Sequence, residues 1–253
     1  MAVSLKGKKI LVTREEHQAK TLADKVKRLE GIPVTVPLLK ITCKDCKDNR
    51  KILERLQTIE WIFFTSANGV HCFFQTLKQD KELSMQGIKT AVVGHKTEAA
   101  LASYGFTADF VPSIYDAKAM GNEFLNRYAN PGPILLVRGN RSRNVLPDTF
   151  SALGIPFEMV EVYDTSLNLQ MKQVLQEKLR LENIDILTFT SPSAVEAFCE
   201  MTPNRETPCI CIGSTTKKRA EEMGFYEVLS PEVFTTDSML ELISDYIAGK
   251  DGL

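Results

Sequence analysis

The sequence lacks any long hydrophobic run and carries almost no net charge. No apolar stretch approaches the roughly 18 residues that suggest a membrane-spanning helix, and the run "ILV" after Lys8 and Lys9 is too short for a signal-peptide core. The formal net charge of -1 gives no overall field that would attract nucleic acid or an anionic membrane. We therefore expect that the protein binds neither nucleic acid nor membrane and that it is cytoplasmic. Any anion that it binds must be held by a local site.

Histidine and cysteine are scarce and are poorly spaced for metal binding. The pair Cys43-Lys-Asp-Cys46 has no second Cys or His pair at the spacing that a tetrahedral zinc site needs. Four other cysteines lie in apolar helix-like or strand-like segments, which is typical of reduced thiols in a cytosolic core: Cys72, Cys199, Cys209 and Cys211. We predict no metal site and no disulfide framework, and a role for Cys43 and Cys46 stays open.

What the sequence does contain is an internal repeat. "KKILVTRE" at 8–15 matches "GPILLVRGN" at 132–140, and "FFTSANGVHCFF" at 63–74 matches "TFTSPSAVEAFC" at 188–199. "LEGIPVTVPLLKIT" likewise matches "ALGIPFEMVEVYDT", and "AVVGHKTEAALASYGF" matches "CICIGSTTKKRAEEMGF". The order is the same in both halves at a spacing of about 120 residues, which is the size of a domain rather than of a solenoid repeat. With 253 residues, 43% apolar and 25% charged, the chain has room for two such domains.

Short apolar runs alternate with helical periodicity within each repeat. We predict strands that are apolar on both faces and helices between them, which together indicate parallel sheets covered on each side. The predicted strands are 8–13, 33–41, 60–65, 88–93, 107–111, 134–137, 156–163, 185–189, 208–212 and 226–229. The predicted helices of the first repeat are 15–30, 48–58, 68–79 and 96–104. The fold class is therefore α/β, with two doubly wound parallel sheets.

Small polar residues, glycines and a few basic groups follow the strands. Ligands of such sheets bind outside the carboxyl ends of the strands. The residues at these ends are Thr13-Arg14, Thr65-Ser66, Gly94 with Thr97, Arg138-Gly139-Asn140, Thr190-Ser191 and Gly213-Ser214-Thr215-Thr216. Each alone is typical of helix N-caps. Together on one edge they also indicate anion sites, because helix N-termini present unpaired N–H groups and a positive dipole end.

Motifs for nucleotide binding and nucleophilic catalysis are absent. The sequence has no GxGxxG, no GxxxxGK[ST] and no GxSxG elbow. His95 follows Gly94 at a strand end, but the matched position in the second repeat is Ser214, so we interpret His95 as a loop residue.

These residues resemble those of the uroporphyrinogen-III synthase family over nearly the whole chain. The motifs that carry the resemblance are "FFTSANGV", "AVVGHKT", "VEVYDT", "FTSPSAVEAF" and "CIGSTTKKRAEEMGF", in this order. The family implies two similar flavodoxin-like domains joined by a two-stranded connector, "VPLLKIT" with "VEVYDT". It implies a discontinuous domain of residues 1–37 and 166–253, a second domain of 38–165, and an active-site cleft between them.

The resemblance also implies an activity. The substrate would be hydroxymethylbilane, a linear tetrapyrrole with eight carboxylates, which loses water to an azafulvene and closes through a spiro intermediate with inversion of the last pyrrole ring. Members of the family need no metal or cofactor, and many act as monomers. The alternative is a non-catalytic, two-lobed binding protein for a small anionic ligand, which would share the repeat and the polar strand ends.

Candidate site residues follow from the matched motifs. The family implies substrate binding by Thr65, Ser66, Asn68, Gly94, Thr97, Ser191, Ser193, Ser214, Thr215 and Thr216. Position at a strand end adds Thr13, Arg14, Arg138, Asn140 and Gly213. Tyr163 in "VYDT" is the family's usual candidate for assisting departure of the hydroxyl, since a phenol can donate a proton. A connector tyrosine that packs on the hinge is the alternative for Tyr163.

Overall fold

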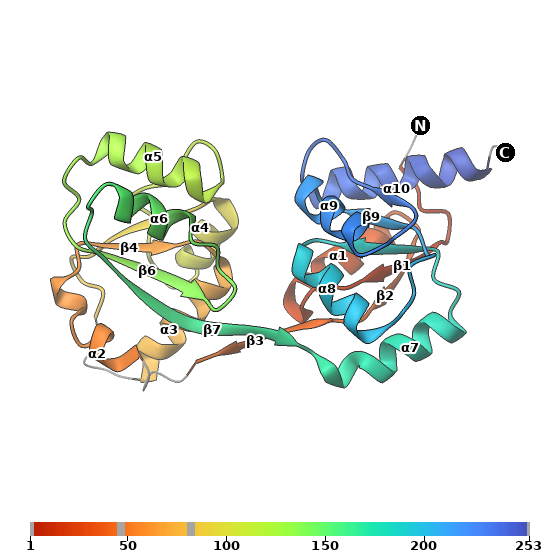
Figure 1. Cartoon of the computed structure of the whole chain (residues 1–253), viewed down its shortest axis with the longest axis horizontal. Coiled ribbons are helices and arrows are strands. Elements are labelled where there is room, and N and C mark those ends of the chain that lie inside the picture. The colour runs from red at the N-terminus through yellow and green to blue at the C-terminus, as the bar shows by residue number, and fades with distance from the viewer. Residues whose placement is uncertain (1–2, 45–48, 80–83, 252–253) are drawn as a thin grey trace. The chain divides into compact units, whose positions relative to one another are not determined.

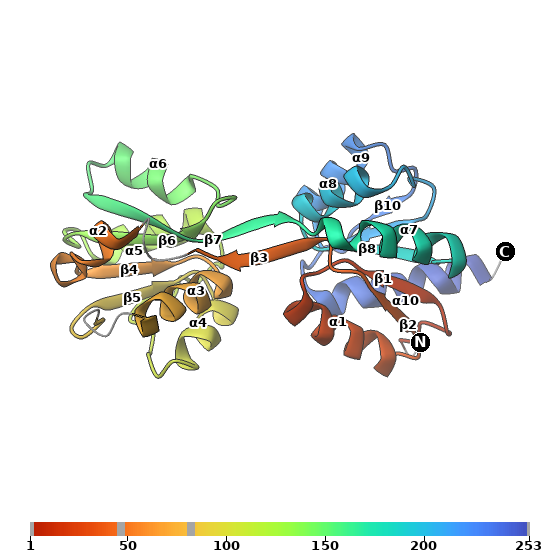
Figure 2. The same cartoon turned by 90° about the horizontal axis from the view of Figure 1, so that it is seen from below.

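The computed structural model describes residues 3–44, 49–79 and 84–251. The chain divides into two compact units, residues 1–40 with 166–253 and residues 41–165. Figures 1 and 2 show that each unit is a sheet with helices on both faces.

The first unit contains a five-stranded sheet in the order β10-β9-β8-β1-β2. Its strands are β1 (Lys9–Val12), β2 (Ile32–Thr35), β8 (Ile186–Phe189), β9 (Cys209–Cys211) and β10 (Val228–Leu229), and all four neighbouring pairs are parallel. The helices are α1 (Glu16–Arg28), α7 (Lys172–Leu181), α8 (Pro192–Met201), α9 (Ser214–Glu222) and α10 (Thr236–Asp251), with a 3₁₀ turn at Leu169–Met171.

The second unit contains a five-stranded sheet in the order β3-β7-β6-β4-β5. Its strands are β3 (Leu39–Cys43), β4 (Trp61–Phe64), β5 (Lys89–Val92), β6 (Ile134–Gly139) and β7 (Phe157–Leu167). The helices are α2 (Arg50–Leu53), α3 (Ala67–Gln79), α4 (His95–Ala102), α5 (Ala117–Arg127) and α6 (Val145–Ala152), with a 3₁₀ turn at Leu56–Thr58. The pairs β4·β5, β4·β6 and β6·β7 are parallel.

Both sheets bury both faces, as the continuous apolar runs predict. In β1, Ile10 and Val12 join the core under α1 and α10, whereas Leu11 between them joins the core under α7, α8 and α9. In β4, Trp61 and Phe63 pack with α5 and α6, whereas Ile62 and Phe64 pack with α2, α3 and α4. Alternate residues of a strand point to opposite faces, so a strand without polar positions requires helices on each side.

Strands that match in the repeat occupy matching places. The neighbours β2-β1-β8-β9 of the first unit correspond to β7-β6-β4-β5 of the second. The strand order reverses between β1 and β8 and between β6 and β4, and a parallel sheet commonly binds its ligand at such a point.

Three segments differ from the predicted elements. The predicted strand 33–41 is divided into β2 and β3, which belong to different sheets; Pro37 lies between them and has no N–H for a ladder. Residues 107–111 form no regular strand but a single bridge between Ala91 and Phe110. The Asp109 carboxylate accepts the N–H of Thr90 at 2.8 Å, where a strand would offer a backbone carbonyl, and Pro112 has no N–H with which to continue the ladder. The predicted helix at 48–58 is reduced to α2 and the 3₁₀ turn at Leu56–Thr58.

The chain passes from one unit to the other within β3 and within β7. The two strands are neighbours in the sheet and run in opposite directions, because Lys44 N–H bonds the carbonyl of Val162 and Asn168 N–H bonds that of Leu38. Figure 2 shows their arrows pointing in opposite senses.

One cysteine prediction is wrong. Cys43 at the end of β3 and Cys72 in α3 form a disulfide, with Cα atoms 5.2 Å apart, so Cys72 is not a reduced thiol. The reason is tertiary: β3 places Cys43 in the core that α3 covers, and no short-range pattern reveals a pairing across 29 residues. Cys199, Cys209 and Cys211 are free, as predicted, and Cys46 lies outside the described residues.

Candidate functional site

The carboxyl ends of three strands meet at one edge of the second unit. Phe64 of β4 lies level with Val92 of β5 and Val137 of β6. The residues that follow these strands therefore share this edge: Thr65 and Ser66 after β4, Gly94 after β5, and Gly139 with Asn140 at the end of β6.

Ser66 links the start of α3 to Tyr163. Its Oγ accepts the N–H of Gly69 at 3.0 Å, which satisfies one of the free donors at the helix N-terminus. The same Oγ lies 3.1 Å from the hydroxyl of Tyr163. Asn68 is half-buried in the first turn of the same helix.

Tyr163 reaches this edge across Gly139. The parallel register of β6 and β7 shifts between Arg138 and Gly139, so that Gly139 lies level with Tyr163. A Cβ on Gly139 would lie 2.3 Å from Cε2 and 2.4 Å from Cζ of the Tyr163 ring. Only 8% of Tyr163 is exposed. The Tyr163 ring therefore lies close against the backbone of Gly139, at the end of the strand where the order reverses.

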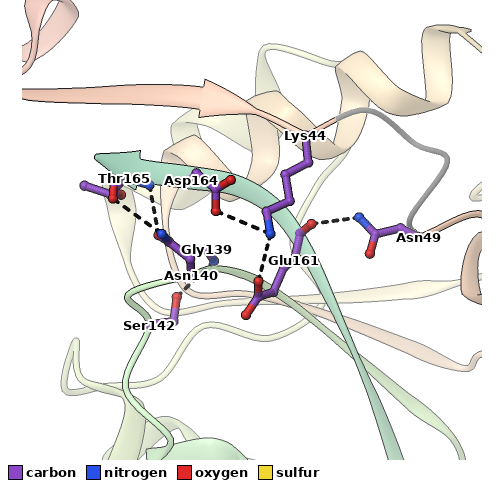
Figure 3. Close-up of polar contacts among 8 residues, drawn as sticks. All are labelled: Lys44, Asn49, Gly139, Asn140, Ser142, Glu161, Asp164 and Thr165. Carbon is purple, nitrogen blue, oxygen red and sulfur yellow. Dashed lines mark hydrogen bonds and ion pairs between the residues drawn. The ribbon is translucent and has the colours of Figure 1, made fainter. Parts of the chain in front are cut away.

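Asn140 pairs with the backbone of β7 on either side of Asp164. Its N–H donates to the carbonyl of Tyr163 at 3.2 Å. Its side-chain Oδ1 accepts the N–H of Thr165 at 2.9 Å, and its Nδ2 donates to the carbonyl of Thr165 at 3.4 Å. Figure 3 shows the Asn140 amide facing Thr165. The amide thus replaces a strand neighbour where β6 has ended.

Lys44 forms ion pairs with two carboxylates of the same part of β7. Its Nζ lies 3.0 Å from the Glu161 carboxylate and 3.3 Å from that of Asp164, as Figure 3 shows. The hydrogen bond to Glu161 raises the pKa of Lys44, and Asp164 adds to the increase. Asn49 Nδ2 donates to the carbonyl of Glu161 at 2.7 Å.

Arg138 donates hydrogen bonds to the loop that follows β6. Its guanidinium donates to the carbonyl of Ser142 at 2.6 Å and to Oδ1 of Asn144 at 3.0 Å. The Ser142 hydroxyl in turn accepts the N–H of Gly139 at 3.0 Å. Arg138 thus supports the turn that follows β6, while its Nε has no hydrogen-bond partner among the described residues; its predicted contact with substrate stays a prediction.

The carboxyl edge of the first unit carries Thr13 and Arg14. Thr13 is 1% exposed, and its hydroxyl donates to the carbonyl of Thr188 at 2.7 Å. Arg14 is half-buried and donates to the side chain of Gln18. Burial lowers the pKa of the Arg14 guanidinium while Glu15 raises it, and arginine stays charged at neutral pH. Arg14 is thus a fixed cation at this edge.

The helices after β8 and β9 begin in two different ways. Ser191 caps α8, with its Oγ accepting the N–H of Ala194 at 3.2 Å and lying 3.0 Å from Oγ of Ser193. Helix α9 begins after Gly213 without a side-chain cap; Ser214 and Thr215 are exposed and Thr216 is buried. The matching helix α4 begins after Gly94 in the same uncapped way, with Thr97 buried.

Comparison with known proteins assigns the family. A sequence model described as uroporphyrinogen-III synthase HemD matches residues 20–241. The chain belongs to this family. It is 27% identical over 258 residues to the porphyrin biosynthesis protein HemD of Ruminiclostridium josui, which covers 98% of this chain but 50% of that protein, so the chain spans half of that relative's length.

Two further relatives align over most of their length. The uroporphyrinogen-III synthase of Chlorobaculum parvum is 27% identical over 94% of this chain and 98% of its own. The crystal structure of uroporphyrinogen-III synthetase from Helicobacter pylori has a TM-score of 0.69 at 20% identity, over 94% of this chain and 99% of that one. The predicted α/β fold is confirmed by the structure and by this likeness, and the sheets are parallel except where β3 meets β7.

An aromatic residue lies beside each of the two glycines that precede the uncapped helices α4 and α9, and the sequence patterns above did not predict it. A Cβ on Gly94 would lie 2.9 Å from the Tyr115 ring, and one on Gly213 would lie 2.9 Å from the Phe234 ring. Both aromatics are more than half exposed. The signal was available, since "PSIYDA" and "PEVFTT" occupy matching places in the repeat.

The described ranges 3–44, 49–79 and 84–251 contain neither a metal-binding cluster nor a membrane-spanning helix. Within them no three His, Cys, Asp or Glu side chains gather as a metal site would need. No helix in those ranges has the length and apolar character to span a membrane.

Proposed function

We propose that the chain is a uroporphyrinogen-III synthase that cyclises hydroxymethylbilane with inversion of the last pyrrole ring. Family membership supports the activity. The matching strand orders support two flavodoxin-like domains with β3 and β7 as their connector. We also propose that the enzyme works as a monomer without metal or cofactor.

The observation that carries the proposal is the placement of Tyr163. Its hydroxyl lies 3.1 Å from Ser66 Oγ at the carboxyl edge of the second sheet, beside the reversal of strand order between β6 and β4. A connector tyrosine that only filled space would not need its hydroxyl at the N-terminus of α3. We propose that from this place the phenol O–H donates its proton to the leaving group.

In the proposed first step the bond between the hydroxymethyl carbon and its oxygen breaks. The oxygen keeps the electron pair, takes the phenolic proton of Tyr163 and leaves as water. The nitrogen of the pyrrole that carries the hydroxymethyl group supplies electrons to this carbon, which gives the azafulvene in its protonated form. The substituted carbon of the last ring then attacks the methylene carbon of the azafulvene, and the new carbon–carbon bond gives the spiro intermediate. Fragmentation and recombination then invert that ring, and the proton lost as the ring regains aromaticity restores the phenol.

Substrate carboxylates would be held at the strand ends of both units. In the first unit the groups are the Arg14 cation, the Ser191 and Ser193 hydroxyls, and the N-terminus of α9 with Ser214 and Thr215. In the second they are Thr65, Ser66 and the N-terminus of α4 after Gly94. Helix N-termini favour anions because of their free N–H groups and dipole.

These contacts are strong enough for the task. The bilane also closes without an enzyme to the uninverted isomer, so the protein must favour one route over another. A hundredfold preference needs about 2.7 kcal/mol of transition-state stabilisation, and one or two hydrogen bonds to a charged group supply about that much. Positioning of the end rings would then account for the product.

The test is to supply freshly generated hydroxymethylbilane and to separate the oxidised products by isomer. The proposal expects mainly the type III isomer and a lower rate for Tyr163→Phe, with Tyr226→Phe, an exposed tyrosine, as the matched control. An isomer ratio equal to that of the enzyme-free reaction would support the binding-protein alternative. Full turnover by Tyr163→Phe would remove the proton donor but not the synthase activity.

A further inference from the structure

We infer that Gly139 and Asn140 are positioning residues for Tyr163, which hold its hydroxyl at Ser66. The inference rests on the role proposed above for Tyr163. It gives Asn140 a different task from the substrate contact suggested by its place at a strand end.

Gly139 provides the space for the phenol ring. The ring atoms Cε2 and Cζ would lie 2.3 and 2.4 Å from a Cβ at this position, far inside van der Waals contact. Tyr163 is 8% exposed and packs in the core with α3 and α4, so the ring cannot swing into solvent without leaving that core. Any side chain at 139 therefore displaces the hydroxyl from Ser66.

Asn140 fixes the backbone from which the ring projects. The N–H of Asn140 bonds the carbonyl of Tyr163, and the side-chain amide bonds the N–H and the carbonyl of Thr165. Beyond Gly139 the strand β7 has no further pairing with β6 and keeps only β3 as a neighbour. Three hydrogen bonds within three residues of β7 keep residue 163 in register with Gly139.

Both polar atoms of the Asn140 side chain bond the backbone of Thr165, which leaves one amide hydrogen of Nδ2 for another partner. Its acceptor is used at 2.9 Å, and one amide hydrogen is directed at the carbonyl of Thr165. The shorter bond is the one that Oδ1 accepts, so a carboxylate oxygen at this position would preserve it. Asn140→Asp is therefore the conservative variant.

Asn49 offers a matched control. It also donates one amide hydrogen bond to the backbone of β7, at the carbonyl of Glu161. Figure 3 shows Asn49 on the far side of Glu161 from Asn140. Asn49→Ala removes a bond of the same kind from the same strand but leaves Tyr163 with its two supports.

The experiment is a double-mutant cycle in kinetics. Gly139→Ala, Asn140→Ala, Asn140→Asp and Asn49→Ala are each made in the native chain and in the Tyr163→Phe chain, and kcat and KM are measured with freshly generated hydroxymethylbilane. In the native background we expect Gly139→Ala and Asn140→Ala to lower kcat at least tenfold with KM changed less than twofold. We expect Asn140→Asp to recover most of the loss and Asn49→Ala to change kcat less than twofold.

The Tyr163→Phe background separates positioning from general structural damage. If the two residues act through the phenol hydroxyl, their substitution changes kcat less than twofold once that hydroxyl is absent. Equal losses in both backgrounds, or a loss mainly in KM, would overturn the inference. If Gly139→Ala does not fold, the two Asn140 variants decide the outcome.

A second readout does not depend on activity. 3-Fluorotyrosine at position 163 reports the surroundings of the ring by fluorine NMR. We expect its resonance to move in Gly139→Ala and Asn140→Ala and to stay in Asn49→Ala; an unchanged resonance in all three contradicts the inference. If Tyr163→Phe alone keeps full turnover, the role of Tyr163 and the inference fail together, while the isomer ratio still tests the synthase activity.

Discussion

Ser66→Ala is expected to destabilise the protein about twice as much as Ser191→Ala. The two serines match in the repeat and both cap a helix: Ser66 Oγ accepts the N–H of Gly69, and Ser191 Oγ accepts that of Ala194. They differ in their second partner. Ser66 contacts the hydroxyl of the buried Tyr163, whereas Ser191 contacts the half-exposed Ser193.

The magnitudes follow from these partners. Loss of a serine N-cap costs about 1 kcal/mol, which applies to both variants. Ser66→Ala also leaves the Tyr163 hydroxyl without this bond in a site that is 8% exposed, which adds about 1 kcal/mol. Water can replace the Ser191 hydroxyl at Ser193, so that loss adds little. We expect about 2 kcal/mol for Ser66→Ala and about 1 kcal/mol for Ser191→Ala.

Urea unfolding of both variants at neutral pH measures these values. Ser66 and Ser191 lie in different units, so the transition of each unit is followed separately if the two do not coincide. Tyr163→Phe and the double variant Ser66→Ala/Tyr163→Phe complete a cycle, in which we expect a coupling of about 1 kcal/mol.

Two results would refute this reasoning. Equal losses for Ser66→Ala and Ser191→Ala would mean that the Tyr163 contact contributes no stability. A coupling near zero between Ser66 and Tyr163 would mean that the two hydroxyls do not interact in solution.

Three other predictions concern features outside the candidate site. Reduction of the Cys43–Cys72 disulfide, which spans 29 residues, should lower the free energy of unfolding by about 3.5 kcal/mol; thiol titration of the denatured chain should rise by two groups on reduction, and an unchanged count would contradict the disulfide. Hydrogen bonds from Ser113 lower the pKa of Glu123, so their stabilisation is present above the ordinary glutamate pKa of about 4.3 and is lost as pH falls through the lowered value. Glu123→Gln should therefore flatten the acid side of the stability profile, whereas parallel profiles would show that the bonds do not form. Arg205 donates to the carbonyls of Cys199, Thr202, Asn204 and Met223. Because lysine lacks the planar fork of arginine, Arg205→Lys should lower the free energy of unfolding in urea by about 2–4 kcal/mol. A loss under about 0.5 kcal/mol would mean that water replaces these bonds.

Local patterns predicted most of the sheet. The runs "WIFF" and "ILTF", apolar except for Thr188, identified β4 and β8, because each apolar residue of such a run needs a covered face and only a doubly wound sheet supplies two. The polar residues after them predicted the caps, and the structure places Ser66 and Ser191 as N-caps of α3 and α8. The repeat then related the two units without any knowledge of strand order.

Contacts between distant strands could not be read in this way. Ser66 and Tyr163 are 97 residues apart, and Asn140 and Thr165 are 25 apart. Whether Tyr163 faces Gly139 depends on the register shift between Arg138 and Gly139, because a shift of one residue moves a side chain to the other face of a sheet. Strand order likewise brings Cys43 to Cys72. The family resemblance therefore named Tyr163 as a candidate, but the sequence did not reveal its two supports.

The central claim is tested most directly by the isomer of the cyclised product. Hydroxymethylbilane is generated in the presence of the purified chain, and the oxidised porphyrins are separated by chromatography. We expect predominantly the type III isomer with the native chain, and slower formation of that isomer with Tyr163→Phe. A product mixture identical to that of the enzyme-free reaction would contradict the claim that this fold directs inversion of the last ring.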